Sequence, residues 1–438
     1  MIDDYMYHWQ YDKIRRLEDR SFCVKNKLRT EVYENAYMVP VEKNDKYMMG
    51  AGGVYSSDGI YVESSAILSS GSMINVSNTS SKYEVYLGRN ENFRVNDCVN
   101  YRNEEVVYLG HIYNHWGHFL VDFSTRLWYL LSEGKGKKGV FIVKNGEEFE
   151  LIANIKRFIS LLEIKEENIE FINVTTKFKK IIVPEASYRT NDYYSTEYLN
   201  MFEMVAKRID SSLSYDKVYF TRKSFKKAIK TEFGENEIEK AFNEAGFISI
   251  SPEKCSLDDQ ISLIRKCKYF AGVSGTITHN LLFAKENQKA IIINKTYIIN
   301  VMQYDINMMK GLDITYADAF DSPFPVSLGV GPFMLECNKN FSGLMKNYFG
   351  VTPKELDESE KKDKIQRYFK SFSEKYYTEY SQKLYAPEDE NSVHYYNPNM
   401  SEHWKYLYEE LYRFSAIKSF AYHVKSRLVS EIKRVVHK

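Results

Sequence analysis

Residues 269–294 have the sequence YFAGVSGTITHNLLFAKENQKAIIIN, and this segment is the clearest indicator of the architecture. The runs YFAGV and AIIIN are apolar and rich in β-formers, which predicts two buried strands, while residues 277–285 between them predict a helix. KVYFTR (217–222) and FISIS (247–251) extend the strand pattern upstream. Further helical patterns cover residues 235–245 and 257–267. Strands and helices that alternate at this spacing predict a parallel, doubly wound sheet.

A similar alternation occurs earlier in the chain. Strand-like runs occur at EVVYLG, GVFIV, IEFINV and KIIVP, and helical patterns cover residues 115–132 and 150–163. Residues 36–88 differ, because short β-forming runs there are separated by Gly, Asp and Ser. Residues 350–438 are charged, tyrosine-rich and helical in pattern. The predicted fold class is α/β, with a β-rich N-terminal segment, two α/β units and a helical C-terminal extension.

The composition excludes several classes of protein. The 438 residues carry 60 Lys and Arg against 59 Asp and Glu, so the formal net charge of +1 gives no global signature of nucleic-acid binding. The five cysteines are widely spaced without a CxxC pair, so neither a disulfide framework nor a structural zinc site is expected. The N-terminus is acidic and no run of 18 apolar residues occurs, which predicts a soluble, cytoplasmic protein.

The densest chemistry lies in residues 110–131, GHIYNHWGHFLVDFSTRLWYLL. If this segment is a regular α-helix, His115, His118, Asp122 and Arg126 fall within an arc of about 80°. Apolar side chains cover the adjoining face and would pack the helix on a sheet. Titratable groups on the edge of such a helix need partners, because burying an unpaired charge is costly.

Three interpretations of this segment remain open. In the first, His118, Asp122 and Arg126 form a ladder of structural contacts that satisfies itself. In the second, His111, His115, His118 and Asp122 bind a metal ion, although their spacing matches no common zinc signature. In the third, Asp122 is a general base, with His118 as the alternate, and the neighbouring groups orient the base or bind substrate.

Small residues form the predicted turn after the strand YFAGV. Gly272, Ser274, Gly275 and Thr276 allow backbone N–H groups to face an anion, and a helix N-terminus also favours negative charge. This arrangement suits the diphosphate of a nucleotide. The segment is neither GxGxxG nor a Walker loop, so it does not indicate NAD or ATP by motif.

Taken together, the two segments resemble glycosyltransferase family 61 and its bacterial relatives in capsular and exopolysaccharide synthesis. The pattern N-x-x-H-[WF]-x-x-D-x-x-x-R-[LF] is matched in spacing by His118, Phe119, Asp122, Arg126 and Leu127, and its Asn resembles Asn114, which stands one residue further from the histidine. Later features of the family are matched by Arg222 in VYFTR, by Asn236-Glu237 and by Gln260 in LDDQISLI. The family's G-x-H-G-A-x-x-x-N-x-x-F loop is matched by Gly272, Ser274, Gly275, Thr276, Asn280 and Phe283. The resemblance covers residues 105–295.

The residue type also departs from the family pattern at four positions. Ser274 replaces the family's loop histidine, Thr276 replaces its alanine, and a histidine, His279, stands beside Asn280. Thr125 occupies the position that is usually proline before the helix arginine. These departures indicate a divergent bacterial branch of the family.

The resemblance implies a GT-B architecture, in which two Rossmann-like domains face a cleft. It also implies an inverting, metal-independent glycosyltransferase that needs no cofactor beyond its nucleotide-sugar co-substrate. Asp122 would be the base with His118 as the alternate, and His115, Arg126 and Asn114 would bind substrate. The donor would be bound by Arg222, Lys227, Glu237, Gln260, Ser274, Gly275, Thr276, His279 and Asn280.

This interpretation divides the chain into three parts. Residues 1–195 would be the acceptor-side domain, 196–345 the nucleotide-sugar-binding domain and 346–438 a helical extension. The acceptor would be a glycan or a lipid-linked saccharide. Residues 411–438 form a basic amphipathic pattern that suits either an anionic membrane surface or packing on the first domain. The enzyme would then be cytoplasmic, or peripheral on the inner face of the membrane.

Two other functions stay open. One is a metal-dependent hydrolase that uses His111, His115, His118 and Asp122, and the other is a non-catalytic carbohydrate-binding protein on the same fold. The chain is also rich in aromatic residues, with 36 Tyr and 26 Phe. Tyrosines gather at Tyr188, Tyr193, Tyr194 and Tyr198 and again at Tyr368, Tyr376, Tyr377, Tyr380, Tyr395 and Tyr396. If they line the cleft, they offer stacking surfaces for a glycan, and if they are buried, they fill the core.

Overall fold

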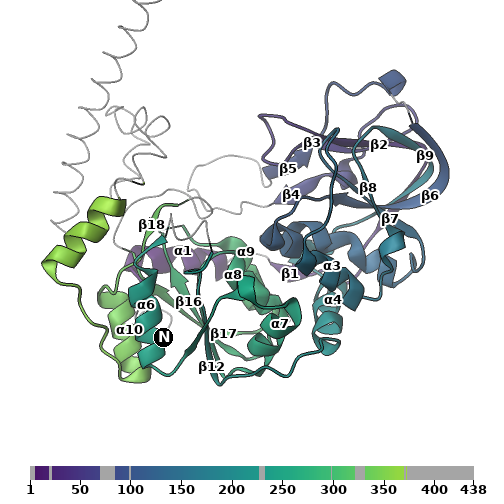
Figure 1. Cartoon of the computed structure of the whole chain (residues 1–438). Coiled ribbons are helices and arrows are strands. Elements are labelled where there is room, and N and C mark those ends of the chain that lie inside the picture. The colour runs from purple at the N-terminus through teal and green to yellow at the C-terminus, as the bar shows by residue number, and fades with distance from the viewer. Residues whose placement is uncertain are drawn as a thin grey trace, which may run out of the picture.

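Two lobes with different sheets make up the protein, which is described here by a computed structural model (Figure 1). The described residues are 5–18, 22–69, 84–97, 100–225, 232–296, 298–320, 331–368 and 371. We call the eight-stranded sheet with the helical segment 116–131 the first lobe. The five-stranded sheet with helices α6 to α10 is the second lobe. The expected α/β class is confirmed.

The first lobe contains a mixed sheet with the strand order β4-β5-β3-β2-β9-β6-β7-β8. Its strands are β2 (Thr30–Glu42), β3 (Gly50–Tyr55), β4 (Ile67–Ser69), β5 (Glu84–Gly88), β6 (Asn100–His111), β7 (Lys138–Ile142), β8 (Ile169–Ile172) and β9 (Thr176–Pro184). Strands β9, β6, β7 and β8 are parallel, whereas β2 pairs antiparallel with β9. The β-rich start of the chain is therefore part of the same sheet as the first α/β series.

The second lobe contains the parallel sheet expected from the sequence, with the strand order β14-β12-β15-β16-β17. Its strands are β12 (Lys217–Phe220), β14 (Ile248–Ile250), β15 (Tyr269–Val273), β16 (Lys289–Asn294) and β17 (Asp313–Asp318). Strands β15 and β16 are apolar along nearly their whole length because both faces of the sheet are covered. Strand β17 was not expected from the sequence.

Helices cover both faces of the second sheet. They are α6 (Glu235–Glu244), α7 (Leu257–Lys266), α8 (Thr276–His279), α9 (Val301–Met309) and α10 (Lys339–Phe349). The apolar side chains of α6 and α10 belong to one core cluster, and those of α7 and α9 belong to another that continues into the first lobe. In Figure 1, α7, α8 and α9 accordingly lie on the side that faces the first lobe.

Local sequence signals place the ends of several helices. Ser256 precedes α7, and its hydroxyl accepts a hydrogen bond from the Asp259 N–H at 3.1 Å, a typical N-cap. Asn338 caps α10 in the same way, through the Phe341 N–H at 3.1 Å. Gly350 ends α10 in the left-handed conformation at φ +69°, which glycine adopts without a steric penalty.

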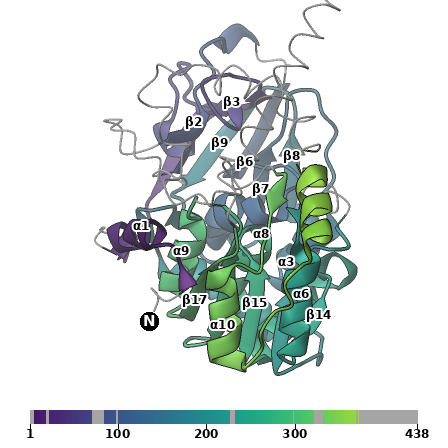
Figure 2. The ribbon, with the colours of Figure 1, turned by 90° about the vertical axis from the view of Figure 1, so that its left-hand side faces the viewer.

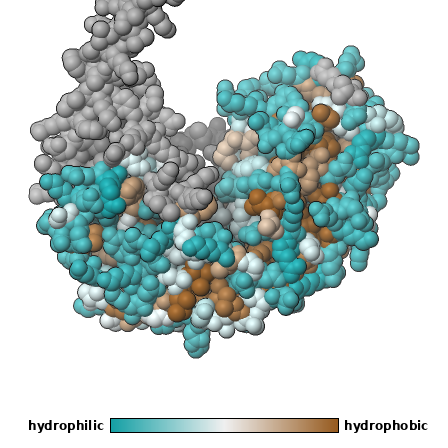
Figure 3. All heavy atoms as spheres, viewed as in Figure 1, coloured by the Kyte–Doolittle hydropathy of each residue, from teal (hydrophilic) through white to brown (hydrophobic). Residues whose placement is uncertain are grey.

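The junction between the lobes is apolar. Helices α3 (Ala153–Leu161) and α4 (Thr196–Lys207) lie here, and their Phe158 and Phe202 rings pack against Phe283 of the second lobe. The guanidinium of Arg157 also donates two hydrogen bonds, of 2.8 and 2.7 Å, to the Asp258 carboxylate on α7. One hydrophobic cluster runs through both lobes as a result. On the face shown in Figure 3, the described surface of both lobes is mainly hydrophilic, with scattered hydrophobic patches.

The N-terminal helix α1 (His8–Glu18) lies beside α9 in both ribbon views (Figure 1; Figure 2). The Tyr7 N–H donates to the Asp318 carboxylate at 2.8 Å, and the Gln10 amide donates to the Thr296 carbonyl at 3.4 Å. Residues predicted for the first domain therefore contact the second lobe, and the domain boundaries stay a prediction. The predicted extension, residues 346–438, would begin within α10 of the second lobe, and its described part includes helical residues 358–368.

Several smaller features complete the described structure. One small sheet has the strand order β1 (Cys23–Val24), β11 (Tyr193–Tyr194) and β10 (Tyr188–Arg189). A second small sheet pairs β13 (Glu232–Phe233) with β18 (Phe333–Met334). Cys23, Cys255, Cys267 and Cys337 have free thiols, and Cys98 lies outside the described residues. No helix in the described ranges combines the length and the apolar character that a membrane crossing requires. The basic tail 411–438 lies outside the described residues.

The tyrosines of the connection between the lobes are mostly core residues. Tyr188, Tyr193 and Tyr198 are buried, and Tyr368 is buried as well. Of the two alternatives left open for these four side chains, core filling is therefore the one that the structure supports. Tyr376, Tyr377, Tyr380, Tyr395 and Tyr396 lie outside the described residues.

Candidate active site

The histidine–aspartate segment is not the single α-helix predicted over residues 115–132. It begins as a short α-turn, α2 (Trp116–His118), widens into a π-turn over Phe119–Phe123, and tightens into a 3-10 helix over Ser124–Leu131. The hydroxyls of Ser124 and Thr125 donate to the carbonyls of Leu120 and Asp122, each at 2.9 Å. Such contacts compete with regular helical hydrogen bonds, and π-turns are frequent at functional sites.

His118 and Asp122 form a close pair at the start of this segment. Nδ1 of His118 lies 2.7 Å from Oδ2 of Asp122. The Asp122 side chain is only 5% exposed, whereas that of His118 is 24% exposed. Because Nδ1 is turned to the carboxylate, Nε2 is the nitrogen left for a substrate. The buried acid therefore orients the accessible imidazole, which is the geometry of an acid–histidine dyad.

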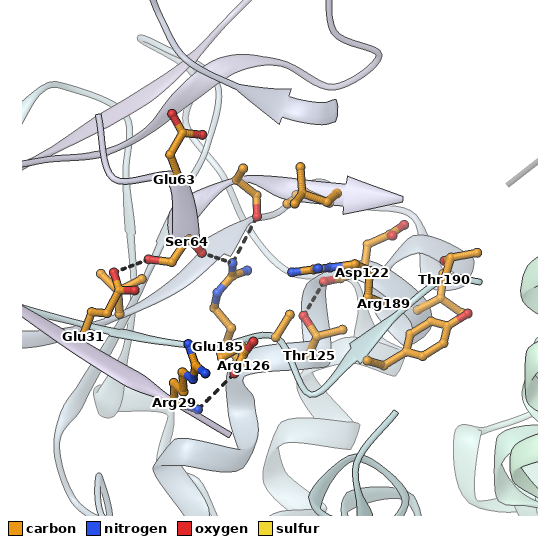
Figure 4. Close-up of a pocket in the computed structure, with 17 residues that line it drawn as sticks. Arg29, Glu31, Glu63, Ser64, Asp122, Thr125, Arg126, Glu185, Arg189 and Thr190 are labelled. Atoms are coloured by element: carbon orange, nitrogen blue, oxygen red, sulfur yellow. Dashed lines mark hydrogen bonds between the residues drawn. The ribbon is translucent and has the colours of Figure 1, made fainter. Parts of the chain in front are cut away.

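Arg126 does not join this pair, so the predicted ladder and the predicted role in orienting Asp122 are wrong. A 3-10 helix has three residues per turn, so a side chain four positions on points about 120° away instead of about 40°. The guanidinium donates to the carbonyls of Pro184, Ser64 and Ala66 at 3.0, 2.8 and 3.2 Å. Figure 4 shows it reaching toward Ser64 beside a cavity of about 130 Å³. Arg126 is a buried structural brace.

Two other residues predicted to bind substrate have structural partners. Nδ1 of His115 accepts the His118 N–H at 3.2 Å and caps α2, and the rings of His115 and His118 lie 4.6 Å apart. The Asn114 amide donates to the Glu150 carbonyl at 2.8 Å and accepts the Ile152 N–H at 3.1 Å. Asn114 thus fastens the loop before α3, which explains its polar contacts without a substrate.

The segment meets the second lobe directly. Nε1 of Trp116 donates to the Asn280 amide oxygen at 2.8 Å, and the Asn280 amide nitrogen donates to the Ile277 carbonyl at 3.1 Å. A Cβ atom on Gly117 would lie 2.7 Å from Oγ1 of Thr276, so only glycine permits this approach. The two segments that resemble one family therefore contact each other across the junction.

The helix after the small-residue loop is shorter than the predicted 277–285. Only Thr276–His279 form α8, and a 3-10 turn over Asn280–Phe283 follows. Four residues give a small macrodipole, so the predicted stabilisation of an anion by a long helix does not apply. Ser274 is buried, and its N–H donates to the Ile293 carbonyl at 2.8 Å.

Two cations lie beside the loop instead. A Cβ atom on Gly275, where φ is +146°, would be 3.8 Å from Nζ of Lys295 and 4.0 Å from Nη1 of Arg222. The Glu232 carboxylate holds both cations, 2.8 Å from Nε of Arg222 and 3.3 Å from Nζ of Lys295. The Arg222 side chain is 19% exposed and Lys295 only 3%. The loop, Arg222 and Lys295 together can receive an anionic group.

Lys295 and Glu232 were missed by the sequence interpretation. A usable signal exists for Lys295, because it directly follows strand β16, as Thr221 follows β12 and Ser274 follows β15. Ligands of parallel sheets bind outside the carboxyl ends of the strands, and these three residues lie at that edge of the sheet. No comparable signal marks Glu232, whose partners Arg222 and Lys295 follow two other strands, β12 and β16.

The buried Glu235 carboxylate accepts hydrogen bonds from residues at the carboxyl end of strand β12. The donors are the Arg222 N–H at 2.6 Å, the Thr221 hydroxyl at 3.2 Å and the Tyr219 hydroxyl at 3.3 Å. Burial, together with the nearby Glu232 carboxylate, raises the pKa of Glu235 to about 7. This residue fixes the backbone from which Arg222 projects.

Three of the predicted donor-binding residues have internal partners. The Gln260 amide donates to the carbonyls of Pro252 and Cys255 at 2.9 and 3.2 Å, so it ties two turns together. Glu237 lies 3.9 Å from Nζ of Lys364. Nδ1 of His279 lies 3.1 Å from the Gln303 side-chain oxygen, and burial lowers the pKa of His279 to about 4. Lys227 lies outside the described residues.

The four residues of the metal-site interpretation do not converge. Within the ranges that the structure describes, no group of three or more His, Cys, Asp or Glu side chains is arranged to hold a metal ion. His111 instead directs Nδ1 at the Ile142 carbonyl, 3.0 Å away. The predicted ligand set of His111, His115, His118 and Asp122 is therefore wrong as a set.

Comparison with known proteins places the region that contains this site in a family. The family model described as Glycosyltransferase 61 matches residues 116–292, from Trp116 in the first lobe to Ile292 in β16. No curated protein matches the chain. The match includes the His118–Asp122 pair, Arg222 and the small-residue loop, and it omits Asn114 and Lys295. The resemblance inferred from the sequence is confirmed: the chain carries a glycosyltransferase 61-like region over residues 116–292.

Proposed function

We propose that this protein is an inverting glycosyltransferase that moves a sugar from a nucleotide-sugar donor to a hydroxyl group of a glycan or lipid-linked acceptor. The observation that carries the proposal is the His118–Asp122 pair, at 2.7 Å, on the segment that contacts the Gly275–Thr276 loop. A base and a cationic pocket on opposite sides of one junction are the two elements that an inverting displacement requires.

The proposed step begins at the acceptor. Nε2 of His118 removes the proton from the acceptor hydroxyl, and Asp122 holds the imidazole and stabilises its charged form. The hydroxyl oxygen forms a bond to the anomeric carbon as the bond from that carbon to the diphosphate oxygen breaks. The electron pair leaves with the diphosphate, whose charge is stabilised by Arg222 and Lys295. Since these cations supply positive charge, we expect the reaction to proceed without a required metal ion.

This assignment reverses the order of the two candidate bases. Asp122 was the first candidate, but its side chain is only 5% exposed and one oxygen is bound to His118. A base must reach within hydrogen-bond distance of the proton that it removes. His118 satisfies this requirement better, and we assign Asp122 as the positioning residue.

The wider setting is also proposed. The two lobes support a GT-B arrangement, with the acceptor mainly on the first lobe and the donor mainly on the second. The resemblance to bacterial members of the family supports a role in capsular or exopolysaccharide synthesis. We place the enzyme in the cytoplasm or on the inner face of the membrane, where lipid-linked acceptors are found.

The test measures turnover of a panel of uridine-, guanosine- and thymidine-diphosphate sugars, with methyl pyranosides as acceptors. His118→Ala is expected to lower turnover about 100-fold or more, because a general base contributes 10²–10⁴-fold. Asp122→Asn is expected to lower turnover as well, because Asn favours the wrong imidazole tautomer. Added imidazole should restore activity to His118→Ala and leave Asp122→Asn unchanged.

Asp216→Asn is the matched control, since the Asp216 side chain forms an exposed ion pair with Lys268 away from the site. It should retain wild-type turnover. Activity within threefold of wild type in both His118→Ala and Asp122→Asn would remove the pair from the mechanism. If the wild type neither binds nor turns over any nucleotide sugar, the transferase proposal is wrong. Binding of methyl pyranosides in that case would favour the carbohydrate-binding alternative.

A further inference from the structure

A second cavity, of about 590 Å³, opens in the first lobe. It lies between the loop joining β2 to β3 (residues 43–49), the end of β6 and the loop after β7 (residues 143–149). Its volume falls within the 300–1,000 Å³ typical of small-molecule sites. The 130 Å³ cavity beside Arg126 is smaller than this range.

His111 lines this cavity, and its hydrogen bonding leaves one nitrogen for a ligand. The residue is only 5% exposed. Nδ1 lies 3.0 Å from the Ile142 carbonyl, which can only accept, so Nδ1 carries the hydrogen. Burial lowers the pKa of His111 to about 4, so the ring is neutral near pH 7. Nε2 is therefore an acceptor, and no described group is hydrogen-bonded to it.

The proposed base, His118, does not line the cavity, but one of the lining rings contacts it. The Tyr113 ring lines it and lies 5.5 Å, between ring centroids, from both His111 and His118. His118 contributes to the electrostatic environment of His111, as it does to that of His279 in the second lobe. The Tyr113 ring thus connects the wall of this cavity to the His118–Asp122 pair.

The lining indicates the chemistry of the occupant. Tyr47, Tyr113 and Phe149 provide aromatic surface, and the Tyr47 ring is packed directly on Gly88. The ionised side chains are three carboxylates and two ammonium groups, so neither an anion nor a cation is strongly favoured. The neutral imidazole of His111, as an acceptor in the cavity lining, requires a hydroxyl or N–H donor from the occupant. A saccharide offers such hydroxyls together with an apolar ring face.

We propose that this cavity binds the acceptor saccharide, with one sugar hydroxyl donating to Nε2 of His111 and the pyranose ring packed on the aromatic wall. The proposal rests on the proposed function, because it makes the occupant the acceptor of the sugar and relies on the Tyr113 ring to link the cavity to His118. It gives His111 a binding role in place of the metal-ligand role considered from the sequence.

The test uses methyl β-glucopyranoside, methyl β-galactopyranoside and methyl N-acetyl-β-glucosaminide as probes of the full-length protein, with binding followed by NMR titration. His111→Asn retains a donor for the Ile142 carbonyl but lacks the acceptor at the Nε2 position. His111→Gln retains an acceptor near that position. At least one probe should bind the wild type, with affinity lowered about fivefold or more in His111→Asn and by less in His111→Gln.

A measurement on the wild type covers the case in which the variants fail to fold. In protein with ¹⁵N-labelled histidine, the Nε2 resonance of His111 should shift when the saccharide that binds is added, because the Nε2 lone pair then accepts a hydrogen bond. An unmoved Nε2 resonance, equal binding to wild type and His111→Asn, or no binding of any probe would overturn the proposal.

Two further measurements, the binding of uridine diphosphate and the hydrolysis of a nucleotide sugar, distinguish a failure of this proposal from a failure of the proposed function. If the wild type turns over a nucleotide sugar but saccharide binding does not depend on His111, only the cavity assignment fails. If saccharide binding depends on His111 but no nucleotide sugar is bound or hydrolysed, the transferase function fails and the cavity remains a saccharide site.

Discussion

At the scale of the residue, the site shows how partners decide the role of a side chain. His118 and Arg126 lie on one segment, each four positions from Asp122, and both are polar. His118 meets Asp122 at 2.7 Å, whereas Arg126 is bonded to three backbone carbonyls. A buried guanidinium needs several acceptors, because its desolvation is costly. Carbonyls at the end of β9 and just before β4 supply these acceptors, so Arg126 stabilises the fold.

Glu235→Gln tests the buried carboxylate under the donor loop. The pKa of Glu235 is raised from 4.5 to about 7 in the folded protein. Between pH 4.5 and about 7, the folded state therefore keeps a proton on Glu235 that the unfolded state has released. Its contribution to stability is present below pH 4.5 and is lost as the pH rises toward 7 and above. The free energy of unfolding of the wild type, relative to Glu235→Gln, should fall by on the order of 3 kcal/mol across this window.

Chemical denaturation at pH 4.5, 6 and 8 measures this difference. His111 and His279 have lowered pKa values and oppose the trend in the wild type, but both are present in the variant, so their effects cancel. Glu244→Gln, at the exposed end of the same helix, is the matched control and should follow the wild type. A constant difference between wild type and Glu235→Gln would show that the carboxylate is ionised throughout.

At the scale of the element, two irregular helices set the geometry of the junction. The first passes from an α-turn through a π-turn to a 3-10 helix, and the second has a single α-helical turn before a 3-10 turn. Each change of helical pitch alters the direction of the side chains that follow. These changes place His118 next to Asp122 and let Gly117 lie against Thr276.

Gly117→Ala tests this contact. The added Cβ would lie 2.7 Å from Oγ1 and 3.0 Å from Cγ2 of Thr276, so one of the two short elements must shift. Overpacking of this kind costs about 1–3 kcal/mol. In a Thr276→Ala background both clashing atoms are absent, and the cost should nearly vanish. A double-mutant cycle on the free energy of unfolding measures the coupling directly.

Thr276→Ala alone supplies the fourth corner of the cycle. If Gly117→Ala costs the same in both backgrounds, the strain comes from another contact, such as that with Cε1 of His115 at 3.2 Å.

At the scale of the whole molecule, polar bonds in a largely apolar junction fix how the lobes meet. The Tyr188 hydroxyl donates to Oδ2 of Asp305 on α9 at 2.7 Å, and the Asn191 N–H donates to the same oxygen at 2.8 Å. Asp305 is fully buried. Because a buried carboxylate depends on its donors, these bonds hold the connection between the lobes against the second lobe.

Tyr188→Phe should destabilise the protein by about 1.5–3 kcal/mol, because it removes a hydrogen bond to a buried charged group. Tyr198→Phe is the matched control. Tyr198 is equally buried, but its hydroxyl donates at 2.8 Å to the Leu120 carbonyl, a neutral group. Its loss should cost about 0.5–1.5 kcal/mol. Thermal and chemical unfolding of both variants gives the comparison, and equal costs would show that Asp305 does not depend on Tyr188.

The fold was largely predictable from the sequence. Strands β12, β14, β15 and β16 and helices α6 and α7 follow the expected pattern, because apolar periodicity and capping residues act over a few neighbours. The family resemblance was recognisable for a related reason, since its motifs are short and occur in order. Strand β17 and helix α9 escaped the prediction because their segment carries no clear periodic signal.

The sequence by itself therefore determined the alternation of strands and helices, the parallel sheet and the two segments that resemble one family. It did not determine which polar groups meet. Lys295 joins Arg222 through Glu232, and His111 turns toward Ile142, because strands from distant parts of the chain end at the same edge of a sheet. Side-chain partnership depends on contacts between residues remote in sequence and on helical pitch. Local patterns carry neither, so only folding separates Arg126 from the active pair and leaves His118 accessible.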